Sequence, residues 1–259
     1  MPAAPWVSRP SRSVSLSKWM RSSPSGPDPL DPGPRGFAHR GLHGPGVPEN
    51  SIAAFRAAVA ARAGIECDVR LSGDGSAVVF HDSNLIRMCD VALEVERTPI
   101  SLLSGQCLHD SGEYVATLFQ VLDLVRGRVP LLIELKTRDG NAASLCTEVA
   151  HDLAPMNGPM GVMSFDPAVG LWLRRNAPHI RRGLVVRHDL PRLKRWLAFL
   201  VAAPQFLAVD RKALHQSWVA RARRRTPVYS WTIRTAAERA QAEVQADALI
   251  WEADGGPRN

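Results

Sequence analysis

Between residues 65 and 71 apolar and polar residues alternate without a break, and the polar positions hold Glu66, Asp68 and Arg70. A period of two is typical of a β-strand, whose successive side chains point to opposite faces. Glu66 and Asp68 therefore lie on one face of one strand, roughly 7 Å apart at Cα. Because like charges are costly to bury side by side, this strand predicts a metal ion or another cation nearby.

The residues before this strand predict a strand and a helix that lead into it. Residues 36–41 contain a short apolar segment, and a loop rich in glycine and proline follows. Asn50 or Ser51 is a suitable N-cap for the next segment, which has apolar residues at helical spacing and ends before Gly64. Residues 36–71 therefore predict a βαβ unit.

A tight turn with an Asp-Gly signal, residues 72–75, follows the alternating strand, and residues 77–80 are apolar again. A turn this short cannot connect parallel strands, so the pattern predicts an antiparallel hairpin. In that hairpin Asp68 lies roughly opposite Phe80 and His81. The predicted geometry therefore brings His81 close to the two carboxylates.

Residues 83–116 lack a clear period, and we interpret them as an irregular surface excursion. Thr117 is then the predicted N-cap of an amphipathic helix. A buried strand follows over residues 130–136, with Glu134 and Lys136 on the face opposite its apolar neighbours. A third carboxylate therefore lies on a second strand.

Short apolar strands and helical stretches alternate through the rest of the chain. Strands are predicted to start near residues 162, 182, 206, 228 and 248, and helices to cover residues 140–154, 167–176, 190–202, 212–224 and 235–245. Alternating strands and helices predict a parallel sheet. Together with the strands near 37, 65 and 131 they make eight strands. This number predicts an α/β fold, a closed (β/α)8 TIM-type barrel, with the hairpin arm added after the second strand. An open doubly wound sheet is the alternative, but the chain lacks a G-x-G-x-x-G or P-loop pattern.

The first 35 residues differ in composition from the rest, because they hold eight prolines among many serines and arginines. This composition predicts a disordered tail at residues 1–35 and one folded domain at residues 36–259. The tail is rich in arginine and serine like an organellar transit peptide, although its prolines oppose the helix that such a peptide forms. Translation from Met20 is another hypothesis.

The chain has a formal net charge of +7 and a pI of about 9.8. A basic surface favours anionic partners such as phosphate esters, nucleic acid or an acidic membrane, but it also aids solubility. The four cysteines lack C-x-x-C spacing, so we expect reduced thiols and a cytoplasmic protein. The longest apolar run, residues 196–203, is far shorter than the roughly 20 residues that span a bilayer.

In a barrel of this kind chemistry takes place at the carboxyl ends of the strands. Glu66, Asp68 and Glu134 would converge there from two strands. Such an oxygen-rich set of ligands favours a hard divalent cation, Mg²⁺ or Ca²⁺. The alternative for Glu134 is a simple ion pair with Lys136.

Four further side chains lie at the same predicted strand ends. His39 and His81 have the chemistry of a general acid and base near neutral pH, and Arg40 and Lys136 can hold a phosphoryl group. A lone histidine at a strand end is more often structural. The combination of all these groups at compatible strand ends favours catalysis.

Several motifs, in order, resemble the glycerophosphodiester phosphodiesterases of the PLC-like phosphodiesterase superfamily. They are His39-Arg40-Gly41, Pro48-Glu49-Asn50-Ser51, Glu66-x-Asp68-Val69, Asp74-Gly75, Val78-Val79-Phe80-His81-Asp82, Leu85-x-Arg87 and Ile133-Glu134-Leu135-Lys136. Weaker landmarks are Ser164-Phe165 and Trp231-Thr232. The resemblance runs from about residue 36 to residue 251 and is more specific in its first half.

This resemblance implies a TIM-type barrel that cleaves glycerophosphodiesters such as glycerophosphocholine to glycerol 3-phosphate and an alcohol, in glycerophospholipid catabolism. The implied roles are metal binding for Glu66, Asp68 and Glu134, acid–base catalysis for His39 and His81, phosphate binding for Arg40 and Lys136, a substrate-pocket role for Trp231, and support of these groups for Glu49 and Asn50. The chain departs from the family at Arg234, where asparagine is usual, and at Trp251-Glu252, where Thr-Asp is usual. Both departures are expected at the wall that contacts the leaving alcohol or glycerol.

Other functions use the same parts. A lysophospholipase D or sphingomyelinase D-like enzyme would act on intact lipids, and residues 190–203, which are basic and apolar, could contact an acidic membrane peripherally. The simpler interpretation of that segment is a barrel helix that packs its apolar stripe inward. A barrel that binds phosphate ligands without turnover is a further alternative. The cluster Arg223-Arg224-Arg225 lacks the aromatic residues of a nucleic-acid site, so we expect no nucleic-acid partner.

Overall fold

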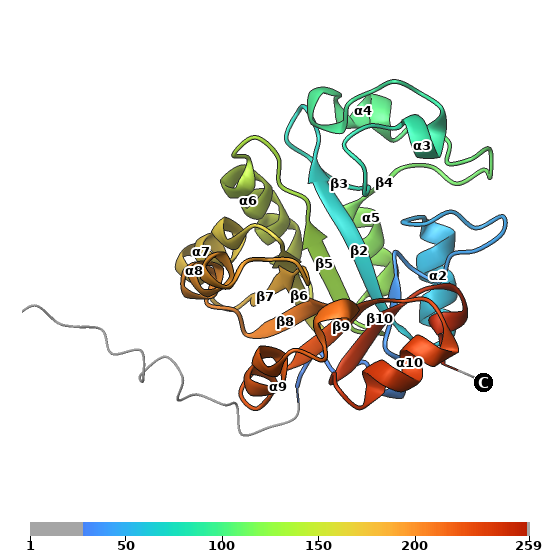
Figure 1. The fold of residues 1–259 in the computed structure, drawn as a ribbon. Coiled ribbons are helices and arrows are strands. Elements are labelled where there is room, and N and C mark those ends of the chain that lie inside the picture. The colour runs from blue at the N-terminus through green and yellow to red at the C-terminus, as the bar shows by residue number, and fades with distance from the viewer. Residues whose placement is uncertain (1–27, 258–259) are drawn as a thin grey trace, which may run out of the picture.

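A computed structural model describes residues 28–257, and its centre is a closed barrel of parallel strands (Figure 1). Each strand pairs in parallel with the next, and the last pairs with the first. In order around the barrel the strands are β1 (Phe37–His39), β2 (Gly64–Leu71), β5 (Leu131–Leu135), β6 (Met160–Ser164), β7 (Arg181–Val186), β8 (Phe206–Asp210), β9 (Val228–Ile233) and β10 (Ala248–Trp251). The predicted (β/α)8 barrel is confirmed, and the predicted strand starts agree with it to within two residues.

Helices cover the outside of the barrel between successive strands (Figure 1). They are α2 (Ile52–Ala60), α5 (Leu118–Val125), α6 (Ala142–Leu153), α7 (Pro167–Asn176), α8 (Arg192–Ala202), α9 (Ser217–Arg223) and α10 (Ala236–Glu243). Ser51 is the N-cap of α2, and Thr117 forms a capping box with Gln120 at the start of α5. The helix predicted over residues 212–224 is divided into η3 (Arg211–Ala213) and α9, because the Asp210 side chain accepts a hydrogen bond from the Lys212 N–H and starts a separate turn.

The predicted hairpin arm is present. β3 (Ala77–Val79) runs antiparallel to β2, with Val69 opposite Val79, and β4 (Ala116–Thr117) adds a third strand beside β3. The Phe80 N–H donates to the Asp68 carbonyl at 3.0 Å, so Asp68 lies opposite Phe80 as the turn predicts. The arm therefore carries His81 toward the carboxylates of β2.

Residues 83–116 are better ordered than the predicted irregular excursion. They form α3 (Ile86–Cys89), η2 (Val95–Arg97) and α4 (Ile100–Leu103), and these pack with the arm around a small core of their own. That core consists of Val78, Phe80, Leu85, Met88, Val95, Leu103, Leu108 and Val115. Helices of three or four residues complete about one turn, which is too short for their apolar residues to show a helical period.

Large apolar side chains fill the end of the barrel interior opposite the carboxylates. Phe37, Phe206 and Tyr229 pack there on Leu30, which is only 1% exposed. A Cβ atom on Gly183 would approach the Phe206 ring to 2.3 Å, so glycine makes room for this aromatic layer. Because this half of the interior is filled, the space beside the carboxylates of β2 and β5 opens toward the other end.

The segment before β1 packs against the closed end. Asp28 accepts a hydrogen bond from the Tyr229 hydroxyl and pairs with Arg181 at 2.7 Å. The short helix η1 (Gly33–Arg35) follows, and the Arg35 carbonyl accepts a hydrogen bond from the Trp251 indole at 2.6 Å. Of the predicted tail, residues 1–27 lie outside the described residues, and packed structure begins several residues before the predicted boundary at residue 35.

The four cysteines are free thiols, as expected. Among residues 28–257, the structure contains no helix with the length and apolar character needed to cross a membrane.

Candidate active site

Three buried carboxylates meet inside the barrel. Asp68 on β2 is directly opposite Glu134 on β5, and Glu66 lies one pleat away on the same face of β2. All three residues are buried: Glu66 is 1% exposed, Asp68 0% and Glu134 7%. One oxygen of each lies within 4.8 Å of the others, so the predicted convergence of the three is confirmed.

Two cationic side chains contact this cluster, but they do not neutralise all of the negative charge of the three carboxylates. Lys136 Nζ lies 3.0 Å from Asp68 Oδ1 and donates a hydrogen bond to Glu134, and Arg40 Nε lies 3.0 Å from Asp68 Oδ2. Glu66 Oε2 accepts the Arg40 backbone N–H at 3.1 Å. The other oxygen, Glu66 Oε1, is buried and has no hydrogen-bond partner among the described residues.

Burial and the neighbouring charges shift the pKa values of the three carboxyl groups in different directions. Burial raises the pKa of Glu66 well above its usual range, and the neighbouring Asp68 and Glu134 charges add to the shift. Burial also raises the pKa of Glu134. Burial opposes ionisation of Asp68 as well, but Lys136 and Arg40 hold its pKa well below the usual range. An all-oxygen cluster in which Glu66 Oε1 is buried with neither a hydrogen bond nor an ion pair among the described residues fits a hard divalent cation.

His39 lies at the end of β1 and is held by a residue from the end of β10. Its Nδ1 donates to Glu252 Oε2 at 2.5 Å, and its Nε2 lies 4.0 Å from Glu66 Oε2. Burial lowers the pKa of His39, while the hydrogen bond to Glu252 opposes that shift. The carboxylate therefore fixes the ring so that Nε2 is the nitrogen nearest the acidic cluster.

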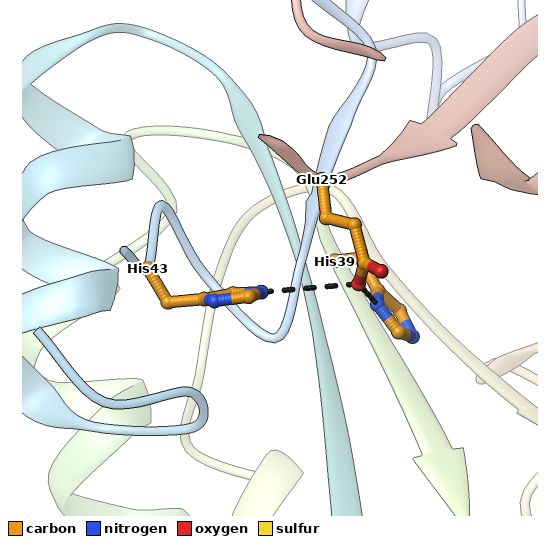
Figure 2. Close-up of side chains that lie close together, drawn as sticks. All are labelled: His39, His43 and Glu252. Atoms are coloured by element: carbon orange, nitrogen blue, oxygen red, sulfur yellow. Dashed lines mark hydrogen bonds and ion pairs between the residues drawn. The ribbon is translucent and has the colours of Figure 1, made fainter. Parts of the chain in front are cut away.

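Two further basic side chains lie close to Glu252. His43 Nε2 lies 3.9 Å from the same oxygen that binds His39, and Figure 2 shows the two rings on either side of this carboxylate. Arg234 Nε donates to the other oxygen at 2.6 Å. Burial would raise the pKa of Glu252, but the hydrogen bond from His39 and the neighbouring His43 and Arg234 side chains hold it well below its usual range. Glu252 and Arg234, which we expect at the wall of the substrate pocket, pair with each other, and Glu252 also binds His39.

His81 follows β3 and also has a carboxylate on Nδ1. The distance from His81 Nδ1 to Asp82 Oδ1 is 2.6 Å, and Arg87 Nε donates to Asp82 Oδ2 at 2.6 Å. Burial lowers the pKa of His81, and the Asp68 charge opposes the shift. Arg70 Nε donates to the His81 carbonyl at 2.8 Å, so β2 also fixes the backbone at this position.

Glu49 and Asn50 support the cluster from the loop before α2. Glu49 Oε1 pairs with Arg40 at 2.8 Å and with Arg87 at 2.6 Å. The Asn50 side chain donates to Asp68 Oδ2 at 3.0 Å and accepts the Asp68 backbone N–H at 3.3 Å. Glu49 therefore orients the arginines, and Asn50 orients Asp68.

Aromatic side chains lie beside Lys136. Trp231, on β9, donates from its indole to the Ala208 carbonyl at 3.0 Å. Its ring meets Phe165 edge to face at 5.6 Å, and Lys136 Nζ lies 5.8 Å from the Phe165 ring centroid. Phe165 therefore lies between Trp231 and Lys136, the cationic group predicted to hold phosphate.

The roles of Glu252, His43, Asp82 and Arg70 were not predicted from the sequence. For Glu252 a signal did exist, because the last strand of a closed barrel is the neighbour of the first, and Ala38 pairs with Trp251. A carboxylate just after β10 therefore falls beside a histidine at the end of β1. Asp82 is adjacent to His81 in sequence, which is a weaker signal.

The sequence model of the Glycerophosphoryl diester phosphodiesterase family matches residues 39–253. The chain belongs to this family. The matched range begins at His39 and includes the acidic cluster, both histidines and Glu252.

Individual relatives agree with this assignment. A glycerophosphodiester phosphodiesterase of Caldanaerobacter subterraneus subsp. tengcongensis is 36% identical over 113 residues, and one of Bacillus altitudinis is 36% identical over 110 residues. Each alignment covers 40% of this chain, and they cover 45% and 44% of the two relatives. The chain therefore matches less than half of the length of these relatives.

A solved structure shows the same fold over nearly the whole barrel. It is an Oleispira antarctica phosphodiesterase in complex with the product sn-glycerol-3-phosphate, with a TM-score of 0.76 and 23% identity. The match covers 86% of this chain and 94% of that chain.

Proposed function

We propose that the protein hydrolyses glycerophosphodiesters, such as glycerophosphocholine, to glycerol 3-phosphate and an alcohol, as a step in glycerophospholipid catabolism. The observation that carries this proposal is the pairing of two histidines with one acidic cluster. His39 Nε2 lies 4.0 Å from Glu66 Oε2, and His81 directly follows Phe80, whose N–H donates to the Asp68 carbonyl. Each has a carboxylate on Nδ1, from Glu252 and Asp82.

The histidines supply the proton transfers. Because Nδ1 of each ring is held by a carboxylate, Nε2 is the atom that can accept or donate a proton. One ring removes a proton from the nucleophile, which is water or the neighbouring glycerol hydroxyl, and the other protonates the departing alkoxide. Attack by water gives glycerol 3-phosphate directly, whereas attack by the hydroxyl gives a cyclic phosphate that water then opens to glycerol 3-phosphate. Burial lowers the pKa of both His39 and His81, which keeps a neutral, basic ring available near neutral pH.

Glu66, Asp68 and Glu134 would hold a divalent cation, Mg²⁺ or Ca²⁺. Such an ion supplies positive charge against the charge that grows on the phosphoryl oxygens. Arg40 and Lys136 hold the phosphoryl group from the protein side. Burial would lower the pKa of Lys136, but Asp68 and Glu134 raise it above its usual range, so this side chain stays cationic.

The aromatic pair Trp231 and Phe165 would contact the glycerol or the alcohol of the substrate. Phe165 is 40% exposed beside Lys136, so a ligand held by Lys136 can reach its ring. An aromatic wall also suits a quaternary ammonium group such as choline. A cytoplasmic location agrees with the free thiols and stays a prediction.

A substrate panel tests the proposal. Release of glycerol 3-phosphate is measured from glycerophosphocholine, glycerophosphoethanolamine and glycerophosphoglycerol, and release of choline from lysophosphatidylcholine, each with EDTA and with added Mg²⁺ or Ca²⁺. We expect turnover of the glycerophosphodiesters that EDTA abolishes and one of the two ions restores. Cleavage of lysophosphatidylcholine alone would favour a lysophospholipase D instead, and binding without turnover of any of them would favour a phosphate-binding barrel.

A further inference from the structure

The outer face of α8 carries a row of apolar side chains that point to solvent. Leu193 is 67% exposed, Trp196 48%, Leu197 46%, and Leu200 and Val201 37% each. Their spacing follows the helical period, so they form one continuous stripe. We name these five residues the outer stripe. The interpretation of this segment as a helix that packs its apolar stripe inward is therefore wrong.

The inner face of α8 is already packed by other residues. Ala202 is buried, and it lies so near α7 that a Cβ atom on Gly170 would approach it to 2.7 Å. Phe199 packs on Trp218 with ring centroids 6.1 Å apart, and the Arg195 guanidinium lies 4.4 Å from the Trp218 ring centroid. Figure 1 shows α8 on the outside of the barrel beside α7. The outer stripe is thus additional to the contacts that hold the helix on the barrel.

Basic residues border the outer stripe on both sides. Successive residues of an α-helix are about 100° apart, which places Arg192 along one edge of the stripe and Lys194 along the other. Both side chains are exposed, and α8 contains no acidic residue. A solvent-facing apolar stripe between cationic edges is the pattern of helices that lie in a membrane interface.

We propose that α8 docks this protein peripherally on an anionic lipid surface. The cationic edges match phosphate and anionic head groups, and the outer stripe fits the boundary between head groups and acyl chains. A second copy of the chain is a poorer fit, because five apolar side chains on one helix fall well short of the roughly 20–30 residues a side of a stable interface. Two like-charged edges would also face each other in a symmetric pair.

The direction of α8 sets how the barrel would lie. A crossover helix begins near the carboxyl ends of the strands and runs back along the flank of the barrel. Docking through the outer stripe would therefore place the barrel on its side, with its mouth open to water. The surface can hold the protein near lipid without covering the acidic cluster.

Vesicle co-sedimentation of the full chain tests the proposal. The vesicles contain either phosphatidylcholine alone or equal parts of phosphatidylcholine and phosphatidylglycerol, at low and high salt. We expect binding to the anionic vesicles that weakens with salt. Trp196→Gln with Leu197→Gln should lower the partition coefficient by about tenfold or more, because the side chains that enter the interface are lost. Arg192→Glu with Lys194→Glu should do the same at low salt.

Matched controls separate the outer stripe from general effects of apolarity and charge. Leu102→Gln with Phe119→Gln removes two side chains that are 55% and 56% exposed elsewhere, and Arg56→Glu with Arg225→Glu reverses two exposed charges away from α8. Both controls should bind like the wild type. Wild-type protein that stays in the supernatant, or unchanged binding by the Trp196 and Leu197 variant, would overturn the proposal.

Sedimentation velocity gives a third check. A wild-type dimer that the Trp196 and Leu197 substitutions convert to a monomer would show that the outer stripe joins two copies, which also overturns the proposal. The measured quantity in each case is binding or mass, so these results do not depend on whether the proposed hydrolysis is correct. Hydrolysis of dissolved glycerophosphocholine should be unchanged in the outer-stripe variants.

Discussion

Nδ1 of His39 lies 2.5 Å from Oε2 of Glu252, across the line where the barrel closes. His39 is the last residue of β1 and Glu252 follows β10, and these first and last strands pair in parallel. Closure of the barrel therefore brings together a histidine and a carboxylate that are 213 positions apart in the chain. The orientation of His39 depends on this long-range pairing.

Glu252→Gln tests that dependence. The amide keeps the shape of the side chain but removes the charge that selects the Nδ1–H tautomer of His39. We expect kcat to fall by on the order of 10²–10⁴ while KM changes little, because the loss affects proton transfer rather than binding. Steady-state kinetics checks this, with Glu243→Gln, a carboxylate on α10 that is 53% exposed, as the control. Wild-type kcat in Glu252→Gln would show that the carboxylate has no part in positioning His39.

His39→Ala and His81→Ala should each lower kcat by at least about 10² and leave the fold intact, because both side chains lie at the barrel mouth outside the apolar core. The circular dichroism spectrum and melting temperature verify the fold, and product release verifies the loss. His151→Ala is the matched control, since that histidine is 82% exposed on α6. A variant that retains full activity would remove that histidine from the acid–base pair.

Glu66→Gln should separate stability from activity. The substitution removes one of three neighbouring buried carboxylates, so the repulsion within the cluster decreases. In EDTA we expect a melting temperature at or above that of the wild type, by about 2–4 °C for each kcal/mol gained. Activity should fall by orders of magnitude, and the rise in melting temperature that Mg²⁺ or Ca²⁺ gives the wild type should disappear. Thermal melts with and without the ion measure both effects. A variant that is still stabilised by the ion would contradict the assignment of Glu66 as a ligand.

The lowered pKa of Asp82 predicts that the free energy of unfolding depends on pH in the acid range. Burial would raise its pKa, but the hydrogen bonds from Arg87 and His81 lower it to about 2 from the usual 3.8. A carboxylate with a lowered pKa stabilises the fold fully above its unfolded pKa, and the contribution is lost as the pH falls through the folded pKa. The wild type should therefore be more stable than Asp82→Asn at pH 6, and the difference should shrink between about pH 4 and pH 2. Urea unfolding at several pH values measures it, and a difference that stays constant would contradict the role of the charge.

The local pattern was sufficient to predict the barrel strands and the acidic cluster. Strands that are buried on both faces appear as short apolar runs between glycines, prolines and polar helices, so each strand is visible on its own. Glu66, Asp68 and Glu134 lie on strands that pair directly, with Asp68 opposite Glu134. The order of the strands in the barrel and the alternation of side chains along each strand were therefore enough to predict that the three carboxylates converge.

Other features depend on what each element faces in the finished fold. The period of residues 192–202 shows that an apolar stripe exists, but not which face of the helix meets the barrel. In the structure Arg195, Phe199 and Ala202 occupy the inner face and leave the larger stripe outside. The partnership of His39 with Glu252 likewise required the closing pair of strands, which no local period reports.

The aromatic layer at the closed end of the barrel gives a final prediction about what the glycines of the strands do. Gly183 on β7 lies against Phe206 on β8, and a Cβ atom there would approach the ring to 2.3 Å. Gly183→Ala should therefore destabilise the protein by about 1–3 kcal/mol through overpacking. Phe206→Leu alone should also cost about 1–2 kcal/mol, because it leaves a cavity.

The double variant Gly183→Ala with Phe206→Leu distinguishes steric conflict from a simple preference of the backbone for glycine. If the Cβ atom and the ring compete for one space, the smaller leucine accepts the added methyl group, and the double variant loses less stability than the sum of the single variants. Unfolding in urea of all four proteins gives the interaction energy, which we expect to be about 1 kcal/mol or more in favour of the pair. Additive losses of stability would show instead that the backbone of β7 requires glycine at this position, whatever the size of residue 206. Ala242→Gly with Phe206→Leu is the control, since Ala242 lies on α10 outside the barrel and should not couple to the ring.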